Sequence, residues 1–161
     1  PLEGVGVGAV ELLLDACGSN AIGQRNKAIL YLLLETGIRA SELLSINVED
    51  IDFSDSSILI RQGKGRKPRT VFMGPTARKN LRRHLKNMPD KGAVFTTREG
   101  DRLTYQGLRQ VIRRLAAKVG IDEPGLHDFR RTFALEQLKM GVDFYTISRL
   151  MGHTDLQVLS R

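Results

Sequence analysis

The chain is poor in the residues that mark secreted and membrane proteins. Its single cysteine, Cys17, excludes an internal disulfide framework and suits a reducing compartment. No histidine lies near Cys17 in sequence, so we expect a buried core thiol. The apolar stretch over residues 28–34 is bracketed by Lys27 and Glu35, and it is far shorter than the roughly 20 residues that span a bilayer. Because no secretory signal pattern is present either, we expect a cytoplasmic protein without a membrane partner.

The remaining composition is that of a globular protein, with 41% hydrophobic and 27% charged residues over 161 positions. This length suits one domain with its own core, and we interpret residues 1–161 as a single domain. Lys and Arg total 25 against 18 Asp and Glu, a net charge of +7. The surplus favours a polyanionic partner without excluding others. Because the chain begins with Pro1, we expect a fragment of a longer protein.

The hydrophobic pattern predicts an α+β fold that is mainly α-helical with a small antiparallel three-stranded sheet. Helical spacing, caps and glycine stops predict a short helix near residues 41–44 and longer ones at residues 9–16, 22–36, 75–86, 104–119, 126–140, 143–151 and 154–160. Short segments rich in β-branched residues predict strands at residues 48–53, 57–61 and 69–73, and one more at residues 94–95. The glycine-rich residues 4–8 indicate a flexible lead-in.

Two segments in the first half of the chain place cations at turns. Residues 36–43 put Arg39 on a turn after a buried helix, with Glu42 about one helical turn further on. Residues 63–69 form a basic loop between two strands, in which glycines flank Lys64. That loop also carries Arg66, Lys67 and Arg69. Each segment taken singly is more typical of a solvated surface than of a site.

Two segments in the second half add histidines. Residues 126–134 place His127 and Arg130 three apart at a helix start, so both are expected to project from one face. Residues 150–155 hold His153 between two short helices. Taken singly, the first pair is more typical of a surface pair and His153 of a helix cap. Four such segments in one order are harder to explain by chance.

Together, the four segments resemble the tyrosine recombinases, the family of phage and transposon integrases and Xer-type recombinases. The resemblance covers nearly the whole chain and implies the DNA breaking-rejoining catalytic-domain fold. It implies cleavage and rejoining of double-stranded DNA through a 3′-phosphotyrosyl intermediate, with no metal or nucleotide cofactor, by a tetramer of the full-length parent. It also implies association with nucleoid DNA. The implied catalytic residues are Arg39, Lys64, His127, Arg130 and His153, with Glu42 in support and Arg66, Lys67, Arg69 and Arg131 as DNA contacts.

The chemistry of phosphodiester cleavage explains why each of these residue types would be needed. In-line attack on a phosphodiester builds charge on the non-bridging oxygens, which the planar donors of Arg39 and Arg130 suit. Two such clamps can stand in for a metal ion. A lysine on a mobile loop can protonate the leaving 5′ oxygen, and histidines can donate to the phosphate or move a proton near neutral pH.

The nucleophile of the family does not match any tyrosine of this chain. Tyr31, Tyr105 and Tyr145 all precede His153, whereas the resemblance places the nucleophile about two and a half helical turns after that histidine. The expected position directly follows Arg161, so we expect these 161 residues to be unable to cleave DNA. The chain also departs from the commonest family pattern at Phe129 and Arg131, where many relatives carry Leu and His.

Two alternative functions stay open at this point. One is a DNA-binding module of the same fold that has lost its chemistry, and the other is a type IB topoisomerase. Two further groups of polar residues are interpreted as part of the surface and not as sites. Asp50, Asp52 and Asp55 indicate a solvated turn rather than a metal site, and residues 82–84 indicate a polar helix face that could touch DNA backbone.

Overall fold

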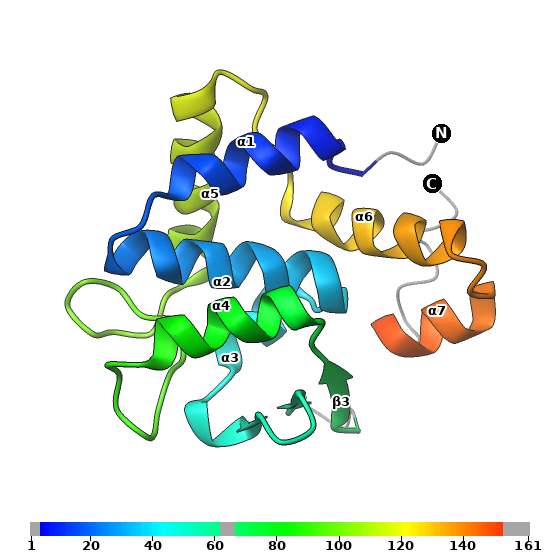
Figure 1. Ribbon diagram of the computed structural model, residues 1–161, viewed down its shortest axis with the longest axis horizontal. Coiled ribbons are helices and arrows are strands. Elements are labelled where there is room, and N and C mark those ends of the chain that lie inside the picture. The colour runs from blue at the N-terminus through cyan, green and yellow to red at the C-terminus, as the bar shows by residue number, and fades with distance from the viewer. Residues whose placement is uncertain (1–3, 62–66, 153–161) are drawn as a thin grey trace.

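A computed structural model describes residues 4–61 and 67–152 of the chain. The helices are α1 (Val7–Cys17), α2 (Ala21–Thr36), α3 (Ala40–Ser45), α4 (Pro75–Leu85), α5 (Tyr105–Val119), α6 (Leu126–Lys139) and α7 (Phe144–Met151). The strands are β1 (Ile51–Asp52), β2 (Ser57–Ile60) and β3 (Arg69–Phe72), preceded by a 3-10 turn, η1 (Val48–Asp50). Figure 1 shows this arrangement, which confirms a mainly helical fold with one small sheet.

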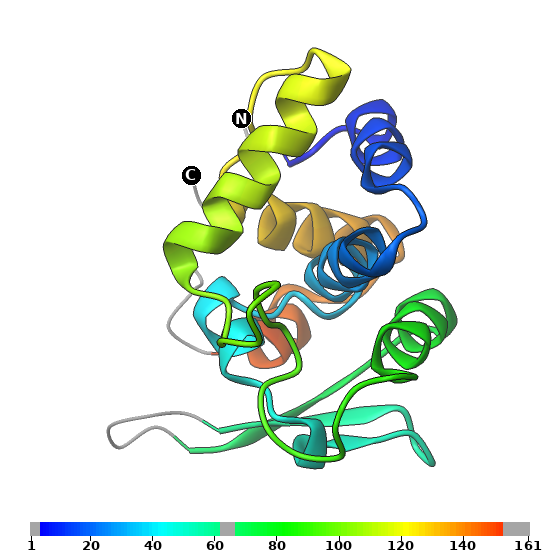
Figure 2. The same cartoon turned by 90° about the vertical axis from the view of Figure 1, so that its left-hand side faces the viewer.

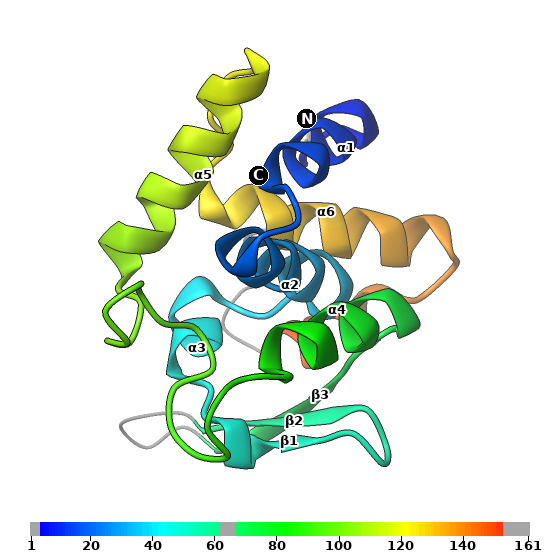
Figure 3. The same cartoon turned by 60° about the vertical axis from the view of Figure 1, so that its left-hand side comes forward.

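Helix α2 lies at the centre of the molecule. It packs against α1, α4 and α6, and Figure 3 shows it between these helices. Its side chains Ile29, Leu30 and Leu33 are almost completely buried. The Asn20 side chain accepts a hydrogen bond from Gly23 N at 2.8 Å, which caps its first turn. Gly37 ends the helix in the left-handed region at φ 67°.

The three strands form an antiparallel sheet in the order β1-β2-β3. In the register of β2 and β3, Ile58 is opposite Val71 and Ile60 is opposite Arg69. Ile58, Ile60 and Val71 are buried, and the sheet lies below α3 and α4 in Figure 3. The β2–β3 connection includes residues 62–66, which lie outside the described residues.

A small second apolar cluster holds α7 against α6. It consists of Phe133 and Ala134 of α6 with Ile147 and Met151 of α7. The end of α2 meets the same cluster, because a Cβ placed on Gly37 would lie 2.4 Å from the Phe133 ring. This approach brings the turn after α2 close to the residues that end α7.

Several local expectations are confirmed. The Thr104 side chain accepts from Gly107 N at 3.0 Å and Gly120 ends α5 in the left-handed region, as the sequence predicts. Pro75 opens α4. The helix expected at residues 154–160 lies outside the described residues. None of the helices in residues 4–61 and 67–152 is long and apolar enough to cross a membrane.

Three expectations are wrong. Residues 48–50 form a 3-10 turn instead of a strand, because the Asp50 carboxylate accepts from Asn47 N at 3.1 Å. Residues 94–95 are not a strand, since only isolated bridges, Asn47 with Ala93 and Thr96 with Arg102, flank them. The glycine-rich lead-in is not free: Val5 N donates to Thr132 Oγ1 of α6 at 2.6 Å, and α1 already begins at Val7.

Candidate active site

Arg39 and Glu42 are joined at the start of α3. The backbone N–H of Arg39 donates to Glu42 Oε1 at 3.0 Å, and its Nη1 donates to Oε2 at 3.1 Å. Glu42 is buried and the Arg39 side chain is mostly buried. A buried carboxylate that accepts both a backbone and a guanidinium donor holds the Arg39 side chain in one direction.

Arg69, at the start of β3, contacts the same carboxylate. Its Nη2 donates to Glu42 Oε1 at 2.6 Å and its Nη1 donates to the carbonyl oxygen of Leu150 at 3.3 Å. The side chain is only 15% exposed. The sequence predicts Arg69 as a DNA contact, whereas its described contacts lie inside the protein and link β3 to α3 and α7.

Arg130 connects three distant segments. It is 3% exposed on α6, its Nε donates to Gly37 O at 2.7 Å, and its Nη2 donates to Met151 O at 2.5 Å. Gly152 follows directly, and a Cβ placed on it would lie 3.1 Å from Nη2 of Arg39. Arg39 and Arg130 therefore approach the same turn at the end of α7.

The charge balance of this group favours an anion. The guanidinium groups of Arg39 and Arg69 share the Glu42 carboxylate, and that of Arg130 binds backbone carbonyl oxygens instead. The carbonyl oxygens of Leu150 and Met151, at the negative end of α7, offset part of this excess. The arrangement holds planar cationic donors in place before any ligand arrives, which is the condition for stabilising charge on a phosphoryl group.

His127 lies at the start of the same helix as Arg130 but in a different environment. It is exposed, whereas Arg130 is buried. Asp128 Oδ2 accepts from Gly125 N at 2.7 Å and holds the first turn of α6. His127 lines a hollow of about 330 Å³ together with Tyr105 and Arg109 of α5. Arg109 was not among the site residues that we predicted from the sequence. The one feature that could have indicated it is its position on the basic, polar face of α5.

Two further predicted site residues, Arg131 and Lys67, lie in the described part of the chain. Arg131 donates to Asp128 Oδ1 at 3.3 Å and is 29% exposed. Lys67 is exposed beside the β2–β3 connection. Lys64, Arg66 and His153 lie outside the described residues, so their predicted roles stay predictions.

The tyrosines lie in three places. Tyr31 of α2 lines a hollow beside α4, and Tyr145 of α7 is 66% exposed beside Arg149. Tyr105, at the start of α5, is 43% exposed and shares the hollow of His127. Tyr105 therefore shares its hollow with a predicted catalytic residue, His127.

Two side chains that the sequence assigned to solvated positions are packed. Asp50 is 7% exposed and accepts from Arg61 Nε at 2.9 Å, so it is not part of a solvated turn. His84 stacks on Phe95 with ring centroids 5.5 Å apart, and its Nε2 donates to Val94 O at 2.8 Å. Burial is the main cause that lowers the pKa of His84.

Cys17 is buried, as expected, and burial raises the pKa of its thiol to about 11. A protonated, buried thiol is a poor nucleophile. In the described part of the chain, no three His, Cys, Asp or Glu side chains gather in a group that could hold a metal ion.

The phage integrase family matches residues 8–161. The tyrosine recombinase XerA of Saccharolobus solfataricus is 36% identical over 149 residues, which are 92% of this chain and 47% of that protein. XerC of Thermodesulfovibrio yellowstonii is 36% identical over 144 residues, 83% of this chain and 48% of that protein. The chain thus spans about half the length of these relatives.

Solved structures agree with this match. The crystal structure of a XerA recombinase superposes with a TM-score of 0.86 at 30% identity, over 99% of this chain and 58% of that one. The Tn1549 transposon integrase in complex with a circular intermediate DNA has the same fold, with a TM-score of 0.82 at 20% identity over 99% of this chain and 61% of that one. The chain belongs to the phage integrase family of tyrosine recombinases.

Proposed function

We propose that this domain cleaves and rejoins double-stranded DNA through a 3′-phosphotyrosyl intermediate, as the catalytic part of a site-specific recombinase. The observation that carries the proposal is the convergence of Arg39 and Arg130 on the turn at Met151 and Gly152. The two arginines come from helices that are far apart in sequence, and they are oriented by buried partners. Such costly burial of charge is expected where the charges do chemistry.

In this mechanism Arg39 and Arg130 bind the scissile phosphate and stabilise the charge that develops on its non-bridging oxygens. Glu42 and Arg69 act as positioning residues, because they hold Arg39 and the end of α7. His127 is exposed at the start of α6, and it is proposed to donate to the phosphate or to move a proton near neutral pH. Lys64 is proposed to protonate the leaving 5′ oxygen, and His153 to bind the phosphate.

The proposed partner is duplex DNA, in agreement with the net charge of +7. Exposed Lys67, with Arg66 and Arg131, is proposed to contact its backbone. We also propose assembly of the full-length protein into a tetramer on DNA. Large exposed apolar side chains at the α6–α7 corner support a protein contact there: Leu138, Met140, Phe144, Tyr145 and Leu150. The proposed reaction would take place on nucleoid DNA in the cytoplasm.

The nucleophile is proposed to be a tyrosine outside these 161 residues. Tyr31 lines the hollow between α2 and α4, and Tyr145 is exposed beside Arg149. Tyr105 is close to His127, but it precedes the Gly-His segment that the family's nucleophile follows.

The test is covalent trapping on a nicked duplex that carries the target site. The protein is the same domain extended through the residues encoded after Arg161, and the readout is a slower protein–DNA band on a denaturing gel. We expect a band from the extended protein and none from the 161-residue chain. Arg130→Lys should slow trapping about a hundredfold or more, because an ammonium cannot replace the planar fork that binds a phosphate.

Arg114→Lys is the matched control, since it makes the same change at an exposed position of α5. Thermal unfolding of each variant separates loss of chemistry from loss of fold. A covalent band from the 161-residue chain that Tyr105→Phe abolishes would show that the nucleophile is Tyr105. No band from the extended protein would favour the non-catalytic DNA-binding module, and plasmid relaxation without strand exchange would favour a topoisomerase.

A further inference from the structure

The outer face of α4 carries an unusual density of positive charge. Cations occupy five positions in and just after the helix, and the helix contains no acidic residue. All five line one shallow hollow of about 600 Å³: Arg78, Lys79, Arg82, Arg83 and Lys86. We name this set the α4 basic face.

The charges of this face repel one another. Arg78 with Arg82, Lys79 with Arg83, and Arg82 with Lys86 are like-charged pairs four residues apart, a spacing at which repulsion destabilises a helix. Arg78 and Arg82 lie over the ring of Phe53, at 5.7 and 5.0 Å from its centroid, but an aromatic ring does not neutralise them. Within residues 4–61 and 67–152, none of the five forms an ion pair with a carboxylate. A bound anion would relieve this repulsion.

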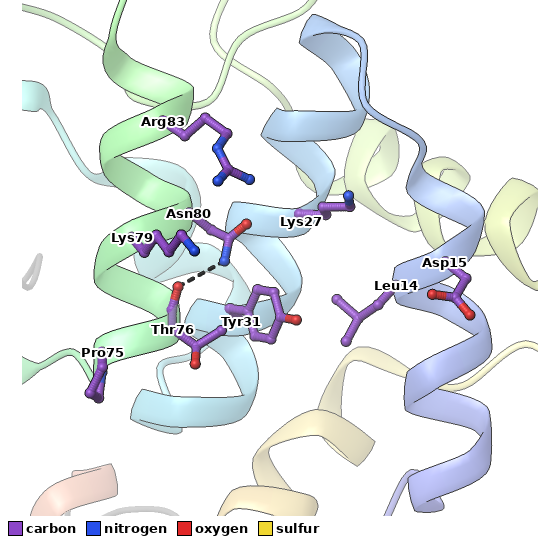
Figure 4. A pocket seen from close by; sticks show the side chains of 9 residues that line it. All are labelled: Leu14, Asp15, Lys27, Tyr31, Pro75, Thr76, Lys79, Asn80 and Arg83. Carbon is purple, nitrogen blue, oxygen red and sulfur yellow. Dashed lines mark hydrogen bonds between the residues drawn. The ribbon is translucent and has the colours of Figure 1, made fainter.

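A second hollow, of about 460 Å³, extends the basic face toward α2 (Figure 4). Lys79 and Arg83 of α4 line it together with Lys27 of α2. Tyr31 and Asn80 add polar groups between the two helices, and the one carboxylate of this lining, that of Asp15, lies across the hollow on α1. The positive surface is therefore built from two helices and is more than one side of α4.

The helix that carries this surface lies apart from two elements of the candidate active site. In Figure 2, α4 lies on the opposite side of the molecule from α3 and the start of α5, with α2 toward the α4 side. Arg39 lies at the start of α3, and the hollow of His127 includes the start of α5. One duplex bound at the active site would therefore leave the α4 basic face open.

We propose that the α4 basic face binds the phosphate backbone of a second DNA duplex, without reading its sequence, while the candidate active site holds the first. The inference rests on the proposed function and extends it, because strand exchange requires two duplexes at one protein assembly. Cations repeat along α4 about every 6 Å, one helical turn, and the guanidinium groups suit phosphate oxygens.

A protein partner is less consistent with this surface. Protein interfaces have an apolar core, often aromatic. Among the described residues, the large exposed apolar side chains lie on other elements, and α4 carries none of them. Binding of a nucleic-acid backbone needs only an array of cations, because the release of condensed counterions drives it.

The test is a bridging assay with the 161-residue chain. A biotinylated duplex on beads captures the protein, the beads are washed, and a fluorescent duplex of unrelated sequence is added. Retained protein reports binding of the first duplex, and retained fluorescence reports binding of the second. The variant is Lys79→Ala with Arg83→Ala. Lys91→Ala with Lys139→Ala is the control, because it removes two exposed charges elsewhere.

We expect the wild-type and control proteins to retain both signals, and the α4 variant to retain protein but lose fluorescence. In a plot of the logarithm of the second-duplex affinity against the logarithm of the salt concentration, the slope of the α4 variant should be shallower by about 1.8. Each of the two lost cations accounts for about 0.9, because one phosphate is no longer neutralised. Equal capture by the α4 variant and the wild type overturns the proposal, as does equal loss in the control. Competition by polyglutamate as strong as by DNA would assign the face to an acidic protein instead.

The same assay separates this inference from the proposed function. If the α4 variant no longer binds even the first duplex, the α4 basic face is the site of all DNA binding. The proposal that the candidate active site binds DNA then fails, whereas the proposal that α4 binds DNA is supported. If the wild type retains no DNA at low salt, both proposals fail.

Discussion

At the scale of single residues, Glu42 organises the candidate site. One carboxylate accepts from the backbone and side chain of Arg39 and from the side chain of Arg69, at distances of 2.6 to 3.1 Å. Hydrogen bonds between ionised groups are about twice as strong as neutral ones. Arg130 is held differently, by the carbonyl oxygens of Gly37 and Met151. Different described partners therefore orient the two arginines.

His84 should make the stability of the protein depend on pH. Burial lowers its pKa below 6.5, the value of the unfolded chain, so the unfolded state binds the proton more readily. This contribution to the free energy of unfolding is fully present above about pH 6.5 and is lost as the pH falls toward the pKa of the folded state. The loss is about 1.4 kcal/mol for each unit by which folding lowers the pKa of His84. Urea unfolding at pH 7.5 and 5.5 should show a larger loss for the wild type than for His84→Gln, whose amide can still donate to Val94 O. Asn87→Gln, an exposed change just after α4 that removes no titratable group, is the control and should show the same loss as the wild type. Equal losses in wild type and His84→Gln would contradict the prediction.

At the scale of secondary-structure elements, α4 is attached through a cap that α2 supplies. The N-cap residue Gly74 has no side chain, and the Glu35 carboxylate of α2 accepts from Ala77 N at 3.2 Å in its place. A Cβ on Gly74 would lie 2.4 Å from Glu35 Oε1, so a larger residue there would displace the Glu35 carboxylate from the cap. Burial raises the pKa of Glu35, while the backbone donors of α4 oppose that rise.

Removing this cap should loosen α4. Glu35→Ala should lower the free energy of unfolding by about 1 kcal/mol, the typical cost of a lost cap. Glu35→Gln should lose less, since its amide oxygen can still accept from Ala77 N. Glu11→Ala, an exposed change on α1, is the control and should have little effect. Equilibrium urea unfolding measures all three, and a Glu35→Ala variant as stable as the wild type would show that the cap contributes nothing.

At the scale of the whole molecule, the chain has a net charge of +7, and two of its positively charged regions lie on elements on opposite sides of α2. One includes the candidate active site and exposed Lys67, and the other is the α4 basic face. A protein charged on two faces can bind a polyanion on each, and both contacts should weaken with added salt.

DNA binding by the 161-residue chain should be weak, nearly independent of sequence and steep in salt. Fluorescence anisotropy between about 50 and 200 mM salt should show a loss of affinity of at least about tenfold. Lys67→Ala should weaken binding equally for all sequences and make the slope shallower by about 0.9. Arg69→Ala should instead lower stability, because its guanidinium holds Glu42 and α7. Salt-independent binding would argue against both basic surfaces.

The sequence by itself determined the features that a few neighbouring residues encode. The helix after Thr104 and its end at Gly120 follow from a hydroxyl cap and a left-handed glycine. The three-stranded sheet follows from β-branched segments and turns, and the order of the four basic and histidine-containing segments identified the family. These signals are local or sequential, so no knowledge of packing was required.

Only the tertiary structure decided which polar side chains are buried. Arg69 turns inward because Glu42, 27 residues earlier, and Leu150, 81 residues later, meet it there. His84 is covered because the irregular segment at Phe95 folds back over α4. The second hollow of the α4 basic face includes Lys27 because α2 packs beside α4. Side chains with the same local pattern become solvated or buried according to the segments packed on them, and those segments are distant in the chain.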